Sequence, residues 1–293
     1  MSLLRSVVVT IVLIFLTGCA LQRPLDLNNA NDNVPTAESE ALLSRAETCF
    51  DQADNATRLN ECRAQYELVL KSNPGDYAAL TQLSTINILI GTAYTERSSR
   101  KSEYFQLAMD YGEQAMLTNP EFRSLVATEV PLWEAVAALD QAEVEAMFFW
   151  VTALQYDFKE GMNLPSRIIN VSWLKRALVV LERIEEVAPE FGGGGVEFAK
   201  AICYFVLPES YGGSEEQGSR LMQTAVEENS NWLLPRWARA KYYFDITDQP
   251  EKKLEELNWI VNQDPADFLD PYPWRMYFIA NSTEILKLRM SEL

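Results

Sequence analysis

One short pattern recurs along this chain and constrains its fold more than any other feature of the sequence. A small residue is followed by mostly apolar residues four and seven positions later, and by a proline twelve positions later. The pattern is clearest in CRAQYELVLKSNP, AMDYGEQAMLTNP and ALVVLERIEEVAP, which begin at Cys62, Ala108 and Ala177. Weaker copies begin at Gly218, where the proline is lost, and at Lys253, where the small residue is lost. Such spacings keep side chains on one face of an α-helix, and proline ends a helix, so the pattern predicts the second helices of helical hairpins.

The pattern resembles the tetratricopeptide repeat, and YELVLKSNPGDYAALTQLS, from Tyr66 to Ser84, is the best match within the chain. Successive copies begin 46, 69, 41 and 35 residues apart rather than at a constant spacing. Strict repeats stack into an open solenoid, whereas interrupted ones leave room for extra helices. We therefore expect an all-α fold, in which degenerate tetratricopeptide-like hairpins close into a compact bundle or short superhelix.

The amino terminus has the pattern of a bacterial lipoprotein signal. Arg5 precedes an apolar run from Val7 to Leu16, which is too short to span a bilayer as a helix. The run leads into LTGC, where small residues precede Cys19 as in a lipobox. This order predicts that residues 1–18 are a cleaved signal peptide and that Cys19 carries the lipid; the alternative is an ordinary secretory peptide with a coincidental cysteine. Several acyl chains on one cysteine would anchor the protein stably to a membrane.

The next segment, residues 19–36, is polar, with two prolines and four asparagines. We expect it to be a flexible tether that joins the lipidated cysteine to a single all-α domain over residues 37–293. Ala20, rather than aspartate, follows the cysteine. In a Gram-negative cell this favours the periplasmic side of the outer membrane as the location.

Charge and composition exclude several classes of function. The net charge is −17, and it becomes −18 when removal of the signal peptide removes Arg5, so nucleic-acid binding is excluded. Histidine is absent, which removes Ser-His-Asp and Cys-His catalysis and histidine-based zinc sites. An enzyme could still use paired carboxylates, such as Glu185 with Glu186 or Glu255 with Glu256, but these pairs lie on polar helix faces where water is the simpler environment. We therefore expect no catalytic residue, no metal site and no cofactor.

Three cysteines remain after lipidation. Cys49 and Cys62 are thirteen positions apart, on what the periodicity predicts to be facing helices of one hairpin. An exported compartment permits disulfides, so we expect these two to be joined. Cys203 lies within an apolar helix and is expected to be a buried free thiol.

Two glycine clusters punctuate the second half of the chain. FGGGGVEFAK begins at Phe191, but it lacks the Gly-Lys-Ser/Thr of a phosphate-binding loop and no βαβ unit surrounds it. The glycines are therefore expected to be turns that allow close approach of neighbouring helices. The expected turn residues are Gly192, Gly193, Gly194, Gly195, Pro208, Gly212 and Gly213.

Two apolar helices carry more aromatic surface than one bundle core needs. Residues 147–154 are apolar on all sides, and residues 198–207 form a short aromatic helix. Such stripes are most often core, but the excess predicts a cavity or channel as well. Further along the chain, the segment WLLPRWARAKYYF contains basic residues among aromatic ones. The aliphatic parts of these basic side chains could simply cover a helix edge, or a guanidinium could recognise a carboxylate at the mouth of the channel. The expected channel or ligand residues are Trp150, Phe198, Tyr204, Phe205, Arg236 and Arg239.

GGGGVEFAKAICYFVLPESYGGS, followed by ARAKYYF and LEELNWIVNQDP, resembles the T component of tripartite ATP-independent periplasmic (TRAP) transporters. The resemblance covers roughly residues 40–290; the additional glycines and Lys253 depart from the family pattern. It implies a non-enzymatic lipoprotein that can form a homotrimer, with an apolar channel through each subunit and a periplasmic solute-binding protein as partner. The transported solute would be apolar or a carboxylate. The alternative is a tetratricopeptide-like lipoprotein that acts as a scaffold for envelope protein assembly.

Overall fold

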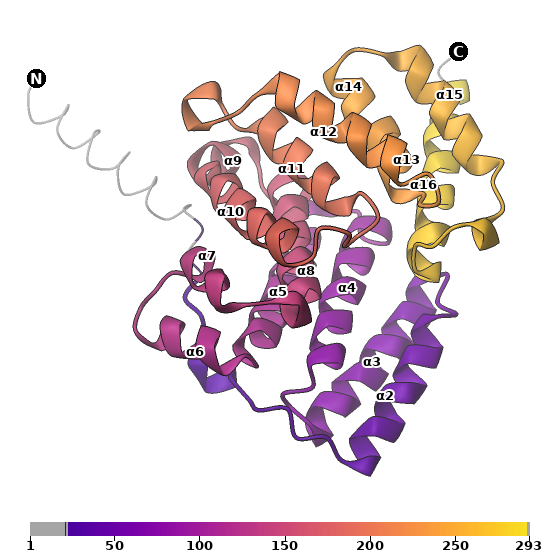
Figure 1. Ribbon diagram of the computed structural model, residues 1–293. Helices are drawn as coiled ribbons and strands as arrows, with labels where there is room; N and C mark the ends of the chain where they lie inside the picture. Colours follow the sequence, from indigo (N-terminus) through magenta and orange to yellow (C-terminus); the bar gives the residue numbers. More distant parts are fainter. Residues whose placement is uncertain (1–20, 22, 292–293) are drawn as a thin grey trace, which may run out of the picture.

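The computed structural model describes residue 21 and residues 23–291 (Figure 1). The predicted signal peptide and Cys19 lie outside these residues. Throughout the described part of the chain the regular structure is helical, without a strand, and the helices pack compactly, which confirms the all-α fold class. No helix within that part is both long enough and apolar enough to cross a membrane.

The longer helices supply most of the fold. They are α2 (Ala37–Phe50), α3 (Ala56–Ser72), α4 (Tyr77–Ala93), α5 (Ser98–Leu117), α6 (Pro120–Ala127), α8 (Val144–Tyr156), α10 (Ser172–Val187), α11 (Gly195–Val206), α12 (Glu215–Glu228), α15 (Pro250–Val261) and α16 (Tyr272–Ser291). Shorter α-helices are α7 (Leu132–Ala135), α9 (Leu164–Asn170), α13 (Leu234–Ala238) and α14 (Phe244–Ile246). Two π-helical turns, η4 (Asp157–Gly161) and η6 (Arg239–Tyr243), extend α8 and α13.

The helices that carry the repeated sequence pattern are α3, α5, α10, α12 and α15, and each ends two to four residues before the proline or its replacement. In each of the hairpins α2–α3, α4–α5 and α11–α12 the two helices pack against each other (Figure 1). Helix α3 packs on α4, and α8 and α10 lie between α5 and α11. The last helix, α16, returns to contact α4, where the Tyr277 hydroxyl lies 3.2 Å from Thr92 Oγ1. This contact closes the array into a bundle, as the irregular repeat spacing predicts.

Polar residues start several of the helices, as their sequence positions suggest. Asn55, Asp76 and Ser214 each accept a hydrogen bond from the backbone N–H three residues later, at the start of α3, α4 and α12. These bonds satisfy amide groups that have no partner within the helix. Further along, Gly212 adopts a left-handed φ of 93°, and a Cβ on Gly213 would lie 1.8 Å from the Leu207 carbonyl oxygen, so this turn requires glycine.

A disulfide joins Cys49 on α2 to Cys62 on α3, with an S–S distance of 2.07 Å. The two helices face each other as a hairpin, which brings the two Cα atoms to 5.4 Å. Cys203 on α11 is a buried free thiol, and burial raises its pKa to about 12. Both cysteine assignments therefore agree with the structure.

The segment before α2 differs from the expected flexible tether. Over its described residues it lies along the helical body and makes specific contacts. The Arg23 guanidinium forms a nearly buried ion pair with Glu113 on α5, with Nε 2.7 Å from Oε1. Further along, Asp32 pairs with Arg123 at 2.7 Å, and the backbone N–H of Val34 donates to Asn73 Oδ1 at 3.0 Å. A polar composition indicates solubility, but it does not show that the folded body carries partners for these polar groups.

Candidate functional site

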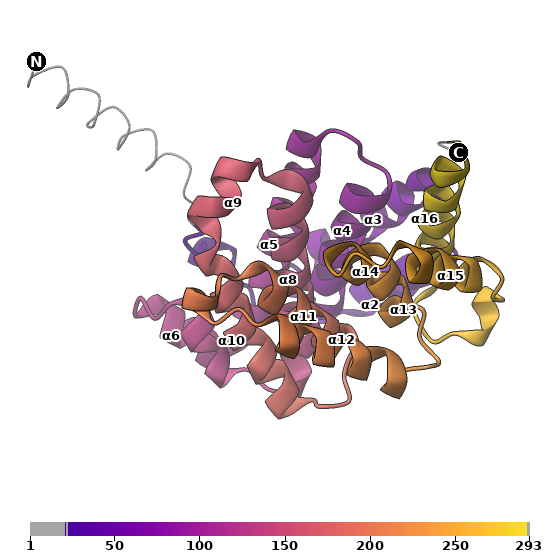
Figure 2. The ribbon, with the colours of Figure 1, turned by 90° about the horizontal axis from the view of Figure 1, so that it is seen from above.

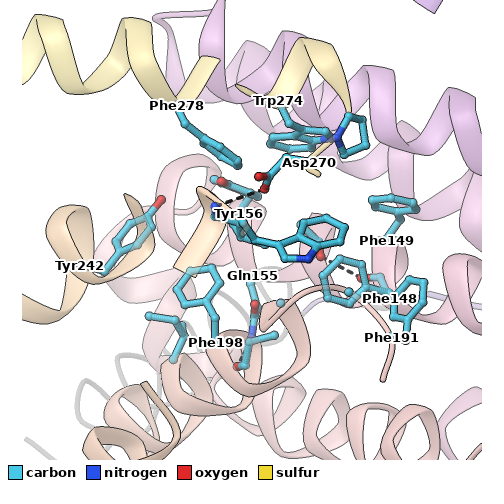
Figure 3. A pocket seen from close by; sticks show the side chains of 18 of the residues that line it. Phe148, Phe149, Gln155, Tyr156, Phe191, Phe198, Tyr242, Asp270, Trp274 and Phe278 are labelled. Carbon is cyan, nitrogen blue, oxygen red and sulfur yellow. Dashed lines mark hydrogen bonds between the residues drawn. The ribbon is translucent and has the colours of Figure 1, made fainter. Parts of the chain in front are cut away.

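A cavity of about 410 Å³ lies between α8, α11 and the start of α16. Its wall is mostly aromatic and aliphatic, and the four-glycine loop and the Trp232 indole complete it. Figure 3 shows these rings pointing toward one another from elements far apart in the sequence. The aromatic residues of the wall are Phe148, Phe149, Tyr156, Phe191, Phe198, Trp232, Tyr242, Trp274 and Phe278.

Helix α8 has two different faces. Met147, Trp150, Val151 and Leu154 are fully buried in the core, where α8 packs on α4, α5 and α10. Phe148 and Phe149 lie on the other side, where both line the cavity. The Phe148 ring packs edge-on against Phe149 at 5.5 Å and against Phe191 at 5.4 Å. The all-round apolar character of the helix therefore has two causes, a core face and a cavity face.

Helix α11 forms the opposite wall. Phe198 stacks on Tyr242 with ring centroids 5.9 Å apart, and Ile202 and Val206 extend the same face by steps of four residues. Gln155 from α8 bridges the two helices, because its Nε2 donates to the Ala199 carbonyl oxygen at 2.8 Å and to Cys203 Sγ at 3.2 Å. This bridge fixes the separation of α8 and α11 beside the cavity.

The four-glycine loop has a structural role in the cavity wall. Gly193 and Gly194 adopt positive φ values of 52° and 84°. A Cβ on Gly193 would lie 2.1 Å from the Trp232 ring, and one on Gly194 would lie 2.8 Å from the Ala225 carbonyl oxygen. Trp232 can therefore cover the loop only because side chains are absent there. The close approach expected from the sequence is present, and an indole occupies the space above the glycines.

Six polar side chains line the cavity beside its apolar wall, those of Glu145, Thr152, Gln155, Lys159, Glu190 and Asp270, and the two glutamates are exposed. Lys159, at the exposed rim, places Nζ 4.6 Å from the centre of the Tyr242 ring, and partial desolvation lowers the pKa of this lysine. The buried Asp270 carboxylate accepts hydrogen bonds from the backbone N–H groups of Leu233 and Leu234, at 2.7 and 3.1 Å. Burial raises the pKa of Asp270, and these two bonds oppose that rise. The aspartate is thus engaged by backbone groups, and Lys159 is a cation that a ligand entering at the rim would meet.

A polar cluster lies behind the Tyr242 ring. Lys241 Nζ donates to the Tyr277 hydroxyl at 3.0 Å and lies 3.9 Å from Glu160 Oε1. Burial lowers the pKa of Lys241 to about 8, although the nearby Glu160 carboxylate raises it in part. Glu160 also accepts a hydrogen bond from Lys101 Nζ at 2.5 Å. The Glu160 carboxylate therefore interacts with both Lys101 and Lys241.

Of the predicted channel residues, Phe198 lines the cavity, and three other aromatic residues do not. Trp150 is fully buried on the core face of α8, where its Nε1 donates to Glu113 Oε1 at 2.9 Å. Tyr204 lies on the face of α11 opposite Ile202 and Val206 because of the helical period. Phe205 is turned toward α12, where Gly218 leaves room for its ring and Tyr243 packs on it at 5.7 Å.

The two predicted arginines do not lie at the mouth of this cavity. Arg236 and Arg239 both pair with Glu256, at 3.2 and 2.5 Å, beside a second hollow of about 410 Å³. The Arg236 guanidinium also stacks over the Trp259 ring at 4.1 Å. The lining residues of the second hollow include none of those that line the aromatic cavity. These arginines are therefore committed to an internal carboxylate, a partner that the sequence pattern did not reveal.

Several residues of the cavity wall were not predicted from the sequence. Phe148 and Phe149 were within the apolar run, but only the packing of α8 shows which of its aromatic residues face a void. Trp274 and Phe278 come from α16, whose return to the first half of the chain has no local sequence signal.

Comparison with protein-family models gives no match for this chain, and comparison with curated proteins gives none either. Within the described residues, no group of histidine, cysteine or carboxylate side chains has an arrangement that could hold a metal ion.

Proposed function

We propose that this protein is a non-enzymatic, lipid-anchored accessory subunit of a TRAP transporter, located on the periplasmic side of the outer membrane. In this role its aromatic cavity takes up an apolar or amphipathic carboxylate solute, and its surface binds the periplasmic solute-binding subunit. The observation that carries the proposal is the cavity itself, with an aromatic wall and a lysine at the rim. The lipobox before Cys19 and the two glycine clusters support the same assignment.

The chemistry of the wall supports an amphipathic ligand. A cavity of this size is within the range of small-molecule sites, which are mostly apolar with a few placed polar groups. An alkyl or aryl chain would lie among Phe148, Phe149 and Phe198, and a carboxylate would remain near Lys159 at the rim.

Binding of dodecanoate and of dodecanol to the purified protein, followed by calorimetry, tests the solute part of this proposal. Thr152→Trp places an indole in the cavity and should abolish binding of both ligands. Gln223→Trp, at the second hollow, is the matched control and should leave binding unchanged. Lys159→Met should weaken dodecanoate about tenfold relative to dodecanol, as expected for loss of one charge-assisted contact. Equal binding by the wild type and Thr152→Trp would refute the cavity as the site.

The partner and the assembly need separate measurements. Co-purification from solubilised membranes should yield a solute-binding protein encoded beside TRAP membrane subunits, and light scattering should give the mass of a homotrimer. Capture of envelope assembly proteins instead would favour the scaffold function. Mass spectrometry of the membrane-extracted protein should show an acylated Cys19 at the mature amino terminus.

A further inference from the structure

The first described residues, Leu21 and Arg23, are held against the helical body beside the end of α9. The backbone N–H of Leu21 donates to Asn170 Oδ1 at the end of α9, at 2.6 Å, and Trp173 Nε1 donates to the Leu21 carbonyl oxygen at 3.3 Å. Arg23 then forms its nearly buried ion pair with Glu113. Two residues of fully extended chain span at most about 7 Å, which limits how far from Leu21 a lipid attached two positions earlier could begin. An acyl group on Cys19 would therefore begin beside α9.

Helix α9 exposes two large apolar side chains. Leu164 is 68% exposed and Ile168 is 66% exposed, and no other large apolar residue in the described part of the chain reaches these values. A separation of four residues places both on the same helix face. Exposed apolar residues scattered singly are normal, but a pair on one face next to a lipidation site points to a common apolar partner.

The local charge is opposite to that of the whole chain. Residues 159–176 contain four basic residues and one acidic residue, a net charge of +3, whereas the full chain carries −17. The acidic residue, Glu160, faces Lys101 in the body at 2.5 Å. Arg167 is on α9 itself, where its guanidinium donates to the Met162 carbonyl oxygen at 3.1 Å. Anionic lipid headgroups attract basic residues placed next to an apolar surface.

From these observations we propose that α9 lies in the interface of the bilayer, with Leu164 and Ile168 inserted among the acyl chains. The proposal rests on lipidation of Cys19, which is part of the proposed function. The clamp on Leu21 and Arg23 holds the body close to the membrane and fixes its orientation, with α9 toward the lipid. Figures 1 and 2 place α16 on the opposite side of the molecule from α9, so the loop before α16 faces away from the bilayer.

Quenching by lipids tests this orientation in the acylated full chain, extracted from membranes and reconstituted in vesicles of phosphatidylethanolamine and phosphatidylglycerol. A fluorophore on Ile168→Cys should be quenched when the vesicles also contain phosphatidylcholine brominated on its acyl chains. The matched control is the same fluorophore on Leu269→Cys, at a side chain that is 60% exposed in the loop before α16. This control should respond only to iodide in the water. Adding Leu164→Ser to the Ile168→Cys chain should reduce lipid quenching severalfold, because one inserted side chain alone contributes about a tenfold preference for the apolar phase.

Several results would overturn the orientation. They are equal lipid quenching at the two positions, no lipid quenching at Ile168→Cys, or shielding of that position from both quenchers, which would indicate a protein partner on α9. The mass of the acylated peptide and dodecanoate binding, measured on the same preparation, report separately on the proposed function. A lipidated, ligand-binding protein without quenching at Ile168→Cys would therefore refute the α9 proposal alone.

Discussion

Replacement of Arg23 should reveal how strongly the amino-terminal segment is held to the helical body. The guanidinium contacts both oxygens of Glu113, at 2.7 and 3.0 Å, and also Gln106 and Asp110, at 2.5 and 2.6 Å. The Arg23 side chain is only 7% exposed and that of Glu113 only 8%. Removal of one partner of such a pair leaves an uncompensated charge and costs about 3–5 kcal/mol.

We expect Arg23→Met to lower the free energy of unfolding by about 3 kcal/mol at neutral pH, near the lower end of that range. The segment can detach and admit water to Glu113, and Trp150 still donates a hydrogen bond to the carboxylate. Both effects limit the cost. The measurement is urea unfolding followed by far-ultraviolet circular dichroism. The matched control is Arg58→Met, which breaks an exposed pair with Glu61 and should cost less than about 1 kcal/mol.

The deficit of Arg23→Met should also depend on pH. Burial already raises the pKa of Glu113 above its ordinary value, against the opposing effect of Arg23, so loss of the arginine must raise it further. A carboxyl group with a raised pKa favours folding in its protonated form, and this stabilisation is lost as pH rises through the interval between the unfolded and folded pKa values. The deficit should therefore be smaller at about pH 5 than at about pH 7.5.

A second change separates the ion pair from the packing around it. Adding Glu113→Gln to Arg23→Met removes the orphaned charge and should recover most of the lost stability, because neutral replacements of a buried pair are often close to neutral in free energy. A single variant Arg23→Met with wild-type stability, or a deficit that does not change with pH, would refute the reasoning.

Three further changes test other parts of the structure. Cys49→Ser with Cys62→Ser should cost about 3 kcal/mol in urea unfolding, the value for a bridge that closes a loop of this length. In the folded wild type the pKa of Lys241 is lowered to about 8, so between about pH 8 and pH 9.5 this lysine is largely protonated only in the unfolded chain. Its contribution to the free energy of unfolding should therefore rise by about 2 kcal/mol over this interval, and Lys241→Met should lack the rise in paired pH titrations of stability. Gly213→Ala, which would place a Cβ against a backbone carbonyl, should lower the thermal midpoint more than Gly212→Ala, which costs only about 1 kcal/mol of backbone strain.

Local sequence patterns were sufficient for the helical elements. The spacing of small residues and prolines predicted the helices that contain the repeats beginning at Cys62, Ala108 and Ala177. It could do so because helix periodicity and helix termination depend on residues that are close in the sequence. The pairing of Cys49 with Cys62 followed for the same reason, since both belong to one hairpin. The glycine loops were also predictable as turns, because only glycine readily adopts the positive φ found at Gly193 and Gly194.

The location of the cavity was decided by tertiary packing. Phe148 and Trp150 are two residues apart in one apolar helix, yet one lines the void and the other lies in the core, because α4, α5 and α10 cover only one side of α8. The same holds for charge: Arg236 and Arg239 had the composition of a ligand site, but folding brings Glu256 to them from α15. Neither the side of a helix that its neighbours leave uncovered nor a charge partner distant in the chain is encoded locally. The sequence by itself determined which segments are helices and where they turn; the way those helices enclose one another decided which side chains face the cavity and which hold the body together.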